Sequence, residues 1–472
     1  MTSTSTSTST STSTSTSTRE QRAGWLRLIA DRLDEHAAEL VEIADRETHL
    51  GAARLTGEVA RTTGQLRLFA DVALEGSHLE AVLDEARPEA TPLQPEIRRV
   101  LRPVGPVAVF SASNFPFAFS VAGGDTASAL AAGCPVIVKA HSGHIELSRR
   151  TAEIVTQALD EAGAPAGTFA LVEGREAGID LVTAPATRAV SFTGSLAGGR
   201  ALLDAIATRP EPIPFYGELG SINPVVVTPA ALAARGEELA SGLVASFTLG
   251  GGQFCTKPGV VFVPRGFASA TSLAERVNAL ERPRLLTDRI ADAFGETLER
   301  LLSVEGVELV AGGAVRDGAP APTVMQASIA AFAEHSDALL EECFGPLTLL
   351  IEYGSLDEVE RAIDAVAGSL TATVHAESAD DIRGLVDRLA ALAGRVLFDG
   401  WPTGVAVTWG QHHGGPWPAT NTQHTSVGAT AIRRFLRPIA YQNAPAAALP
   451  LDLTDAGLAR IPHRRNGELI LP

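Results

Sequence analysis

Apolar residues near the start of the chain recur at helical spacing. Trp25, Ile29 and Leu33 lie four positions apart, and charged residues are common between them. A hydrophobic period close to 3.6 residues is typical of an amphipathic helix, so the pattern predicts a helix over residues 20–48. The same spacing recurs over residues 55–72 and predicts a second helical segment there.

Short apolar runs alternate with stretches of helical length from residue 107 onward. Repeated strand and helix units predict a parallel, doubly wound sheet with helices on both faces, which is an α/β fold of the Rossmann type. Such a sheet binds ligands beyond the carboxyl ends of its strands. The strands are expected at Val107–Phe110, Val136–Val138, Phe169–Val172 and Ala189–Phe192, and the helices at Ser120–Ala132 and Ile145–Ala162.

A second α/β pattern begins near residues 220–224, where we expect a domain boundary. The last fifty residues are rich in Gly, Pro, His and Trp and carry little period, so we expect loops that wrap the other domains. The chain then divides into a tail (1–18), a first domain (19–223), a second domain (224–420) and a wrapping segment (421–472). The second pattern comprises strands at Val225–Val227, Val260–Val263, Leu347–Glu352 and Thr371–His375 and a helix at Glu237–Phe247.

The charge of the chain argues against two classes of partner. The 55 acidic residues outnumber the 38 basic ones, and the formal net charge is -17. We therefore predict neither a nucleic-acid partner nor an anionic membrane surface. The longest uncharged run, Pro103–Gly124, is broken by three prolines and by polar residues, so we interpret it as a strand that leads into a loop rather than as a membrane span.

The tail and the cysteines indicate the compartment. Residues 2–18 repeat Ser and Thr and cannot bury enough apolar surface to fold, so residues 1–18 are predicted to be disordered. This repeat lacks the basic and apolar regions of a secretory signal. Three cysteines at wide spacings exclude a disulfide scaffold and offer no zinc-ligand pattern. We expect a cytoplasmic protein without a metal.

Cys255 is the first candidate for chemistry, because it follows three consecutive glycines in the segment Gly250–Gly259. Glycines let the backbone take conformations closed to other residues and approach a ligand closely. Most isolated cysteines are small buried hydrophobes, but this loop favours an exposed nucleophile whose thiolate Lys257 would stabilise. Cys134 is expected to be structural, and the two glutamates before Cys343 would raise the pKa of its thiol.

Polar residues also follow the predicted strands. Glu218 ends a strand-like segment and is either a solvated carboxylate or a functional one. Asn114 follows the first strand and is either a turn residue or a donor to a developing oxyanion. Lys139 ends the second strand, and Phe192–Arg200 joins a strand to a helix through glycines. That junction could face a phosphate at the helix N-terminus, although a tight turn without a ligand has the same pattern.

The order of these motifs resembles the aldehyde dehydrogenase superfamily over residues 20–460. Within it, the stretches Phe254–Gly259, Gly414–Thr420 and Arg433–Asn443 resemble the α-ketoglutaric semialdehyde (2,5-dioxovalerate) dehydrogenases, a subgroup similar to NADP-linked fatty aldehyde dehydrogenases. The motifs that carry the resemblance are Asn114–Pro116, Lys139, Phe192–Ser195 with Gly199, Glu218–Gly220, Gly252–Cys255 and Glu341–Pro346.

The resemblance implies a role for each catalytic candidate. The Cys255 thiolate would attack the aldehyde, and the Asn114 side chain and the Cys255 backbone N–H would hold the oxyanion. Glu218 would then activate water to release the carboxylic acid, with a pKa that burial tunes upward. The first domain would be the NAD(P)-binding domain and the second the catalytic domain. The family assembles as dimers or tetramers through an exchanged strand, so we expect a homo-oligomer and, beside the two α/β domains, a small oligomerisation element.

The resemblance also implies a cofactor site. Lys139 and Glu342 would bind ribose hydroxyls, and the turn from Gly194 to Gly199 would face the pyrophosphate. Many NAD-preferring relatives carry a glutamate where this chain has Ser142. A carboxylate there would repel a 2′-phosphate, so we predict a preference for NADP, with NAD accepted less well. The complete set of expected cofactor residues is Lys139, His141, Ser142, Arg175, Thr193, Gly194, Ser195, Gly199, Leu219, Glu342 and Phe344; for Arg175 an exposed surface role is the alternative.

The implied substrate is an aldehyde, with 2,5-dioxovalerate oxidised to 2-oxoglutarate as the first choice. A fatty or other aliphatic aldehyde is the alternative. A CoA-acylating enzyme is disfavoured because Glu218 is present and such an enzyme needs no base to activate water. A binding protein without activity is disfavoured because Asn114, Glu218 and Cys255 are all present. The aromatic residues expected to line the substrate tunnel are Phe115, Phe117, Phe254 and Trp401.

Overall fold

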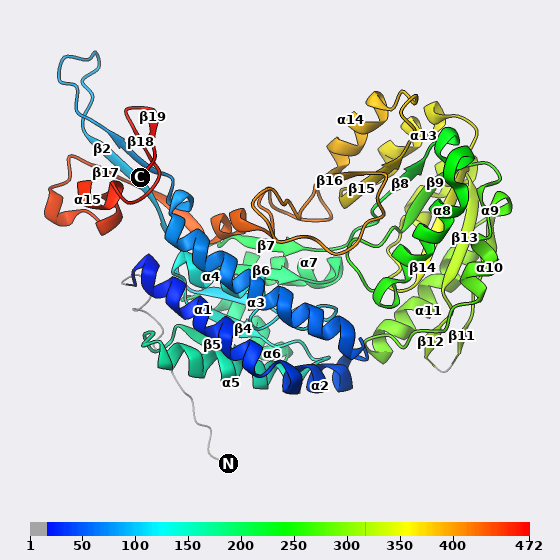
Figure 1. Cartoon of the computed structure of the whole chain (residues 1–472), viewed down its shortest axis with the longest axis horizontal. Coiled ribbons are helices and arrows are strands. Elements are labelled where there is room, and N and C mark those ends of the chain that lie inside the picture. The colour runs from blue at the N-terminus through cyan, green and yellow to red at the C-terminus, as the bar shows by residue number, and fades with distance from the viewer. Residues whose placement is uncertain (1–16, 317) are drawn as a thin grey trace.

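The computed structural model describes residues 17–316 and 318–472 (Figure 1). Most of the predicted tail, residues 1–16, lies outside the described residues. Its last two residues are part of the fold, contrary to the expectation for 1–18, because Thr18 caps the first helix, α1 (Arg19–Glu35). The Thr18 hydroxyl accepts from the Gln21 backbone N–H, and the Gln21 side chain accepts from the Thr18 backbone N–H.

A five-stranded parallel sheet forms the body of the molecule, in the order β5-β4-β3-β6-β7. Helices cover both of its faces, as the alternating pattern predicts. Odd-numbered residues of β3 pack with α1–α5 in one core, and even-numbered ones pack with α6 and α7 in another. The elements are α2 (Ala37–Thr48), α3 (Ala52–Glu75), β3 (Val107–Phe110), α4 (Gly124–Ala132), β4 (Val136–Lys139), α5 (Ile145–Glu161), β5 (Phe169–Val172), α6 (Arg175–Thr183), β6 (Ala189–Thr193), α7 (Leu196–Ala207) and β7 (Phe215–Glu218).

A seven-stranded sheet forms the second lobe, in the order β10-β13-β14-β9-β8-β15-β16, and only the β10–β13 pair is antiparallel. Two apolar cores lie on its two faces. Its elements are β8 (Val225–Val227), α8 (Pro229–Thr248), β9 (Val260–Pro264), α9 (Phe267–Ala270), α10 (Leu273–Asn278), α11 (Asp288–Leu302), β10 (Val307–Ala311), β13 (Thr323–Ser328), α12 (Ile329–Leu339), β14 (Leu347–Tyr353), α13 (Leu356–Ala362), β15 (Ser369–His375), α14 (Arg383–Leu392) and β16 (Ala393–Phe398). A small hairpin of β11 (Val315–Arg316) and β12 (Ala319–Pro320) accompanies it.

A third sheet projects from the body as an arm, in the order β17-β2-β1-β18-β19 (Figure 1). It corrects the expectation that the last fifty residues are loops, because three of its strands come from that segment. Two of them, β17 and β18, pair with strands more than 300 positions earlier in the chain, which no local period reveals, and β19 pairs with β18. The elements are β1 (Ala81–Asp84), β2 (Ile97–Pro103), β17 (Leu436–Gln442), α15 (Asp455–Leu458), β18 (His463–Arg465) and β19 (Glu468–Ile470).

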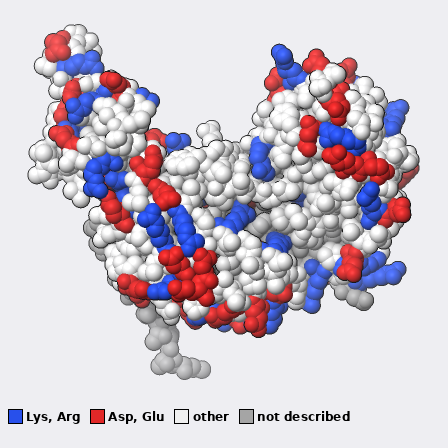
Figure 2. Space-filling view, viewed as in Figure 1, with Lys and Arg blue, Asp and Glu red and all other residues white. Residues whose placement is uncertain are grey.

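The surface carries charges of both signs. In the view of Figure 2, basic and acidic side chains are interspersed, and this face of the described chain has no broad basic area. In the described residues, no helix combines the length and the apolar character needed to cross a membrane.

Candidate active site

The carboxyl ends of the parallel strands bring the sequence-predicted residues to one edge of the first sheet. Phe110, the last residue of β3, pairs with Lys139 on one side and with Phe192 on the other. Thr193 in turn pairs with Glu218 at the end of β7. This is the edge at which doubly wound sheets bind their ligands.

The loop that carries Cys255 takes its shape from its glycines. Gly250, Gly251 and Gly252 have φ angles of 58°, 69° and 70°, in the left-handed region. A Cβ on Gly252 would lie 2.3 Å from the backbone of Gly345, so a side chain cannot be accommodated there. The glycine run therefore has the backbone role that the sequence predicts for it.

Asn223 fixes the far side of the same loop. Its side-chain amide donates to the carbonyl oxygens of Cys255 at 2.8 Å and Lys257 at 2.9 Å. Sequence reasoning gave Asn223 no role beyond the domain boundary, because the loop that it contacts lies more than thirty residues later.

Asn114 contacts Gln253, which lies two residues before Cys255 in the loop. Its side-chain Nδ2 donates to the Gln253 carbonyl oxygen at 2.9 Å, and its own carbonyl accepts from Arg54 Nη2 at 2.5 Å. The side chain is buried. One N–H of the Asn114 side-chain amide thus holds that side chain against the loop that carries the Cys255 thiol.

His413 links the two main candidates, and the sequence analysis did not identify it. Its Nε2 lies 3.0 Å from Glu218 Oε1 and 3.6 Å from Cys255 Sγ. His413 and Glu218 are almost fully buried, whereas Cys255 is partly exposed. The pair His412–His413 directly before a Gly-Gly-Pro sequence was the available signal.

The ligand atoms of Glu218, Cys255 and His413 lie within 4.8 Å of one another, so they also form a group that could hold a metal ion.

A buried network orients Glu218 from its other side. The Ser426 hydroxyl donates to Glu218 Oε2 at 2.7 Å, while the Ser426 backbone N–H donates to the His413 carbonyl. Arg434 pairs with Asp125 at 2.6 Å and donates to the Ser426 carbonyl at 3.4 Å. The C-terminal segment therefore does more than wrap the molecule, because it positions both His413 and Ser426.

The protonation states differ from those expected from the sequence. Burial raises the pKa of the Cys255 thiol well above its ordinary value, and the negative charge of Glu218 raises it further. For Glu218, burial alone would raise the carboxyl pKa, but His413, Ser426 and Cys255 outweigh burial and leave the pKa lowered. The expectation of a resting thiolate is wrong, and the upward tuning of the Glu218 pKa by burial is outweighed by its partners. The site at rest pairs a thiol with a carboxylate.

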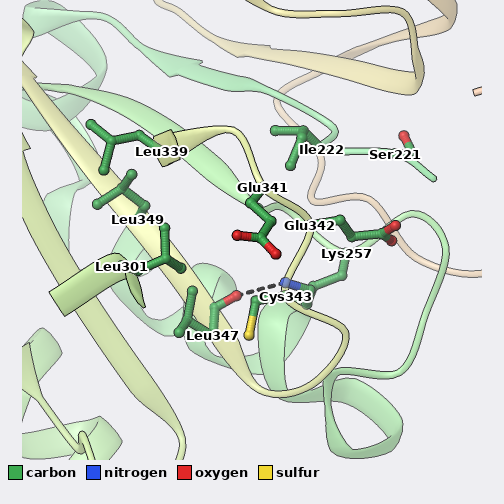
Figure 3. A pocket seen from close by; sticks show the side chains of 11 residues that line it. Ser221, Ile222, Lys257, Leu301, Leu339, Glu341, Glu342, Cys343, Leu347 and Leu349 are labelled. Atoms are coloured by element: carbon green, nitrogen blue, oxygen red, sulfur yellow. Dashed lines mark hydrogen bonds between the residues drawn. The ribbon is translucent and has the colours of Figure 1, made fainter. Parts of the chain in front are cut away.

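Lys257 does not stabilise the thiolate as expected. Its ammonium is buried and donates to the Leu347 carbonyl at 2.7 Å, in the pocket of Figure 3, which Glu342 and Cys343 also line. Burial raises the pKa of Glu342 to about 7, against the opposing charge of Lys257. Burial, with Glu341 and Glu342 contributing, raises the pKa of Cys343 to about 12.

Cys134 is also a neutral thiol. It is fully buried, and burial raises its pKa to about 11. Its Sγ contacts the Phe435 carbonyl oxygen at 3.4 Å. These features agree with the structural role expected for it.

The expected cofactor residues surround the same sheet edge. Lys139 ends β4, and burial lowers the pKa of its ammonium, a cost that a ligand hydroxyl or phosphate would offset. His141 and Ser142 come two and three residues after it; burial lowers the pKa of His141 to about 3, so the ring is a neutral donor, and Ser142 is exposed. Arg175 begins α6 and is exposed.

The β6–α7 turn has the form expected of a phosphate-facing junction. Thr193 ends β6, Gly194 follows, and Ser195 caps α7 by accepting from the Gly198 backbone N–H at 3.2 Å. A Cβ on Gly199 would lie 2.3 Å from a methyl carbon of Leu219, so the glycine permits close packing of α7 on the chain after β7. These donors and the helix N-terminus fit the hydroxyls and phosphates of a dinucleotide. Glu342 and Phe344 come from the second lobe and are each partly exposed, and Glu342 Oε2 lies next to Gly220, which follows β7.

The aromatic residues divide between two places. Phe115, Phe119 and Phe254 line a cavity with Cys255, His413 and Arg61. The ring centroids of Phe115 and Phe254 are 5.1 Å apart. Phe117 instead packs in the core beneath α1 and α3, and the Trp401 ring lies 4.5 Å from that of His375. Two of the four expected tunnel residues therefore line this cavity, and Phe119 was not anticipated.

Comparison with known proteins identifies the family. Residues 4–416 match the aldehyde dehydrogenase family, so the chain belongs to that family and is an oxidoreductase that acts on aldehydes with NAD(P) as cofactor. It is 46% identical to alpha-ketoglutaric semialdehyde dehydrogenase 2 of Azospirillum brasilense, over 95% of this chain and 87% of that protein. It is 42% identical to alpha-ketoglutaric semialdehyde dehydrogenase of Acinetobacter baylyi, over 96% of this chain and 88% of that protein.

Solved structures agree on the fold. Aldehyde dehydrogenase 21 of Physcomitrella patens, in complex with the reaction product succinate, matches 92% of this chain and 88% of its own with a TM-score of 0.76 at 20% identity. An oxidoreductase from Marinobacter aquaeolei matches 91% of this chain and 87% of its own with a TM-score of 0.73 at 26% identity. The chain thus has the aldehyde dehydrogenase fold, as expected from its motifs.

Proposed function

We propose that this chain oxidises 2,5-dioxovalerate to 2-oxoglutarate through a thioester on Cys255. The observation that carries the chemistry is the contact of His413 Nε2 with both Glu218 and Cys255. The substrate rests on the names of the two relatives at 46% and 42% identity, which act on this semialdehyde.

The first half of the reaction forms the carbon–sulfur bond. Because the Cys255 thiol is neutral at rest, Glu218 takes its proton as the sulfur attacks the aldehyde carbon. The negative charge then moves to the aldehyde oxygen. The second N–H of the Asn114 amide and the Cys255 backbone N–H are the donors proposed for that oxygen.

The second half consumes the thioester. Glu218 returns its first proton to solvent and then takes one from an attacking water, whose oxygen displaces the sulfur and completes the carboxylate. His413 donates its Nε2–H to the Glu218 carboxylate and holds it next to the sulfur. Between the two halves, the bound cofactor would accept the hydride that leaves the former aldehyde carbon, which turns the thiohemiacetal on Cys255 into the thioester.

We propose that NADP is preferred over NAD. Residues 19–223 would hold the cofactor, and residues 224–420 would supply the thiol. Support comes from the donors after β4, because Lys139 and Ser142 offer hydrogen bonds and no carboxylate occupies position 142.

A fatty or other aliphatic aldehyde is the second candidate. The three phenylalanine rings around the Cys255 cavity favour it, because they offer an apolar wall. A panel of aldehydes decides between the two: 2,5-dioxovalerate, succinic semialdehyde, glutaraldehyde and decanal, each with NADP and NAD. The proposal predicts the highest kcat/KM for 2,5-dioxovalerate with NADP. A large advantage for decanal would contradict the substrate and leave the family unchanged.

We also propose a cytoplasmic homodimer or homotetramer. Three free cysteines are typical of a reducing compartment. The outer strand β16 of the seven-stranded sheet ends at Phe398, whose side chain is 57% exposed. An uncovered edge strand with an exposed aromatic residue favours pairing with another chain. Light scattering of the purified protein tests this, and a monomer at micromolar concentration would contradict it.

A further inference from the structure

An arginine lies in the cavity that contains the candidate nucleophile. Arg61 comes from α3 and lines the cavity together with Cys255, His413 and the three phenylalanines. Its Cζ lies 5.6 Å from the ring centroid of Phe115 and 5.3 Å from that of Phe119. The aromatic faces hold the planar guanidinium in place without using its N–H groups.

One edge of this guanidinium is free to bind a ligand. Nε and Nη2 of Arg61 are both buried, and neither has a hydrogen-bond partner among the described residues. These two nitrogens direct their N–H groups to the same side, which is the edge that binds a carboxylate through two parallel hydrogen bonds. Leaving two such donors buried and unpaired costs free energy that a ligand would recover.

The neighbouring acids do not pair with Arg61, and Glu58 Oε2 is itself buried without a hydrogen-bond partner among the described residues. Glu58, three residues earlier on α3, accepts with Oε1 from the Phe117 and Ala118 backbone N–H groups at 2.9 and 3.0 Å. Glu218 is bonded to His413 and Ser426. Within the described chain, Arg61 forms no ion pair within 4.0 Å of a carboxylate oxygen. Burial lowers the pKa of Arg61, and the charges of Glu58 and Glu218 oppose this shift; a guanidinium stays charged under such a shift.

We propose that Arg61 binds the distal carboxylate of the substrate and so makes the cavity selective for short aldehydes that end in a carboxylate. This inference rests on the proposed function and names a residue for its substrate class. The three phenylalanines then enclose the carbon chain between the carboxylate and the aldehyde, and Cys255 meets the aldehyde end.

The test compares two variants on one helix with two aldehydes of equal chain length. Arg61→Gln removes the charge and keeps a polar side chain. Arg67→Gln is the matched control, because Arg67 lies on the exposed side of α3 and pairs with Asp31 and Asp34. With 2,5-dioxovalerate, Arg61→Gln should raise KM about 10- to 100-fold. With pentanal, which has no carboxylate, kcat/KM should change less than about threefold. Arg67→Gln should match the wild type with both aldehydes.

Two further measurements keep the outcomes distinct. Glutarate, a dicarboxylate without an aldehyde, should compete with pentanal in the wild type and lose about 10-fold or more in affinity in Arg61→Gln. Arg61→Lys keeps the charge without the two parallel N–H donors, so its KM for 2,5-dioxovalerate and its affinity for glutarate should lie between those of the wild type and Arg61→Gln. It replaces Arg61→Gln in the test if that variant does not fold. Equal losses with both aldehydes, or unchanged KM for 2,5-dioxovalerate, would overturn the role of Arg61. A wild type without preference for 2,5-dioxovalerate over pentanal would instead overturn the proposed substrate, while glutarate competition would still test Arg61.

Discussion

His413 Nε2 lies 3.0 Å from Glu218 Oε1, and the contact is buried. The same nitrogen faces Cys255 Sγ at 3.6 Å. Because the carboxylate accepts from this N–H, its pKa stays lowered although burial alone would raise it. A single ring thus fixes the base next to the nucleophile.

Replacing His413 tests that arrangement. In His413→Asn, the donor to Glu218 is displaced, so kcat should fall about 10- to 100-fold while KM for the cofactor stays within about twofold. His412→Asn is the control, because the neighbouring ring has no contact with Glu218 among the described hydrogen bonds. Steady-state kinetics with 2,5-dioxovalerate measures both. An unchanged kcat in His413→Asn would show that the contact has no role in turnover.

The raised pKa of Cys255 predicts a pH dependence of its alkylation. Burial and then the charge of Glu218 raise the pKa, so the reactive thiolate is scarce at neutral pH and increases only under alkaline conditions. In Glu218→Gln the negative charge is gone, so the midpoint of iodoacetamide labelling should move to lower pH. Labelling at Cys255 is followed by peptide mass spectrometry. A midpoint near pH 7 in the wild type, or an upward shift in the variant, would contradict the resting thiol.

Glu342 predicts a second pH dependence, in cofactor binding. Burial raises its pKa to about 7, so the carboxylate is largely protonated at pH 6 and ionised at pH 8. If it accepts from ribose hydroxyls, KM for NADP should fall several-fold between these values. Glu342→Gln should flatten this profile, and Glu341→Gln, on the exposed neighbour, should not. If KM for NADP in Glu342→Gln depended on pH as it does in the wild type, Glu342 would be excluded as the origin of that dependence.

Ser142 tests the choice between the two nicotinamides. A carboxylate at the exposed position 142 would repel a 2′-phosphate and accept from a ribose diol. Ser142→Glu should therefore lower the ratio of kcat/KM for NADP to that for NAD by about tenfold or more. Ser142→Ala, which adds no charge, should leave the ratio within about threefold. No change in Ser142→Glu would mean that the selectivity arises elsewhere.

The sequence predicts the elements whose pattern is local. The apolar runs of β3, β4, β5 and β6 are found within one residue of their predicted bounds, because a buried parallel strand needs a continuous apolar run. The backbone conformation of the Cys255 loop is also as predicted, because three consecutive glycines are typical of a backbone that other residues cannot adopt.

Features that depend on distant pairing were not predicted. Strand β17 contains Pro438 and alternates weakly, and it becomes a strand because β2 pairs with its whole length. His413 reaches Glu218 only because the segment around residues 411–426 folds over the end of β7. Arg61 is one of several charged residues on α3, and tertiary packing alone distinguishes it from Arg67.

The protonation state of Cys255 could not be predicted for a similar reason. A lysine two residues away in sequence suggested a stabilised thiolate, but the Lys257 ammonium is directed to the Leu347 carbonyl. The charge with the largest effect on Cys255 is that of Glu218, which comes from the end of β7 and has the opposite sign to Lys257.

Trapping the acyl-enzyme tests the central claim most directly. In Glu218→Gln both thiol activation and hydrolysis lack their base, so the enzyme is mixed with 2,5-dioxovalerate and NADP at alkaline pH, where the Cys255 thiol ionises without Glu218, and should give at most one reduced nicotinamide per chain. Intact-mass spectrometry should then detect one acyl group, and peptide mapping should place it on Cys255. An acyl group on another residue, or full turnover without any adduct in Cys255→Ala, would contradict the account.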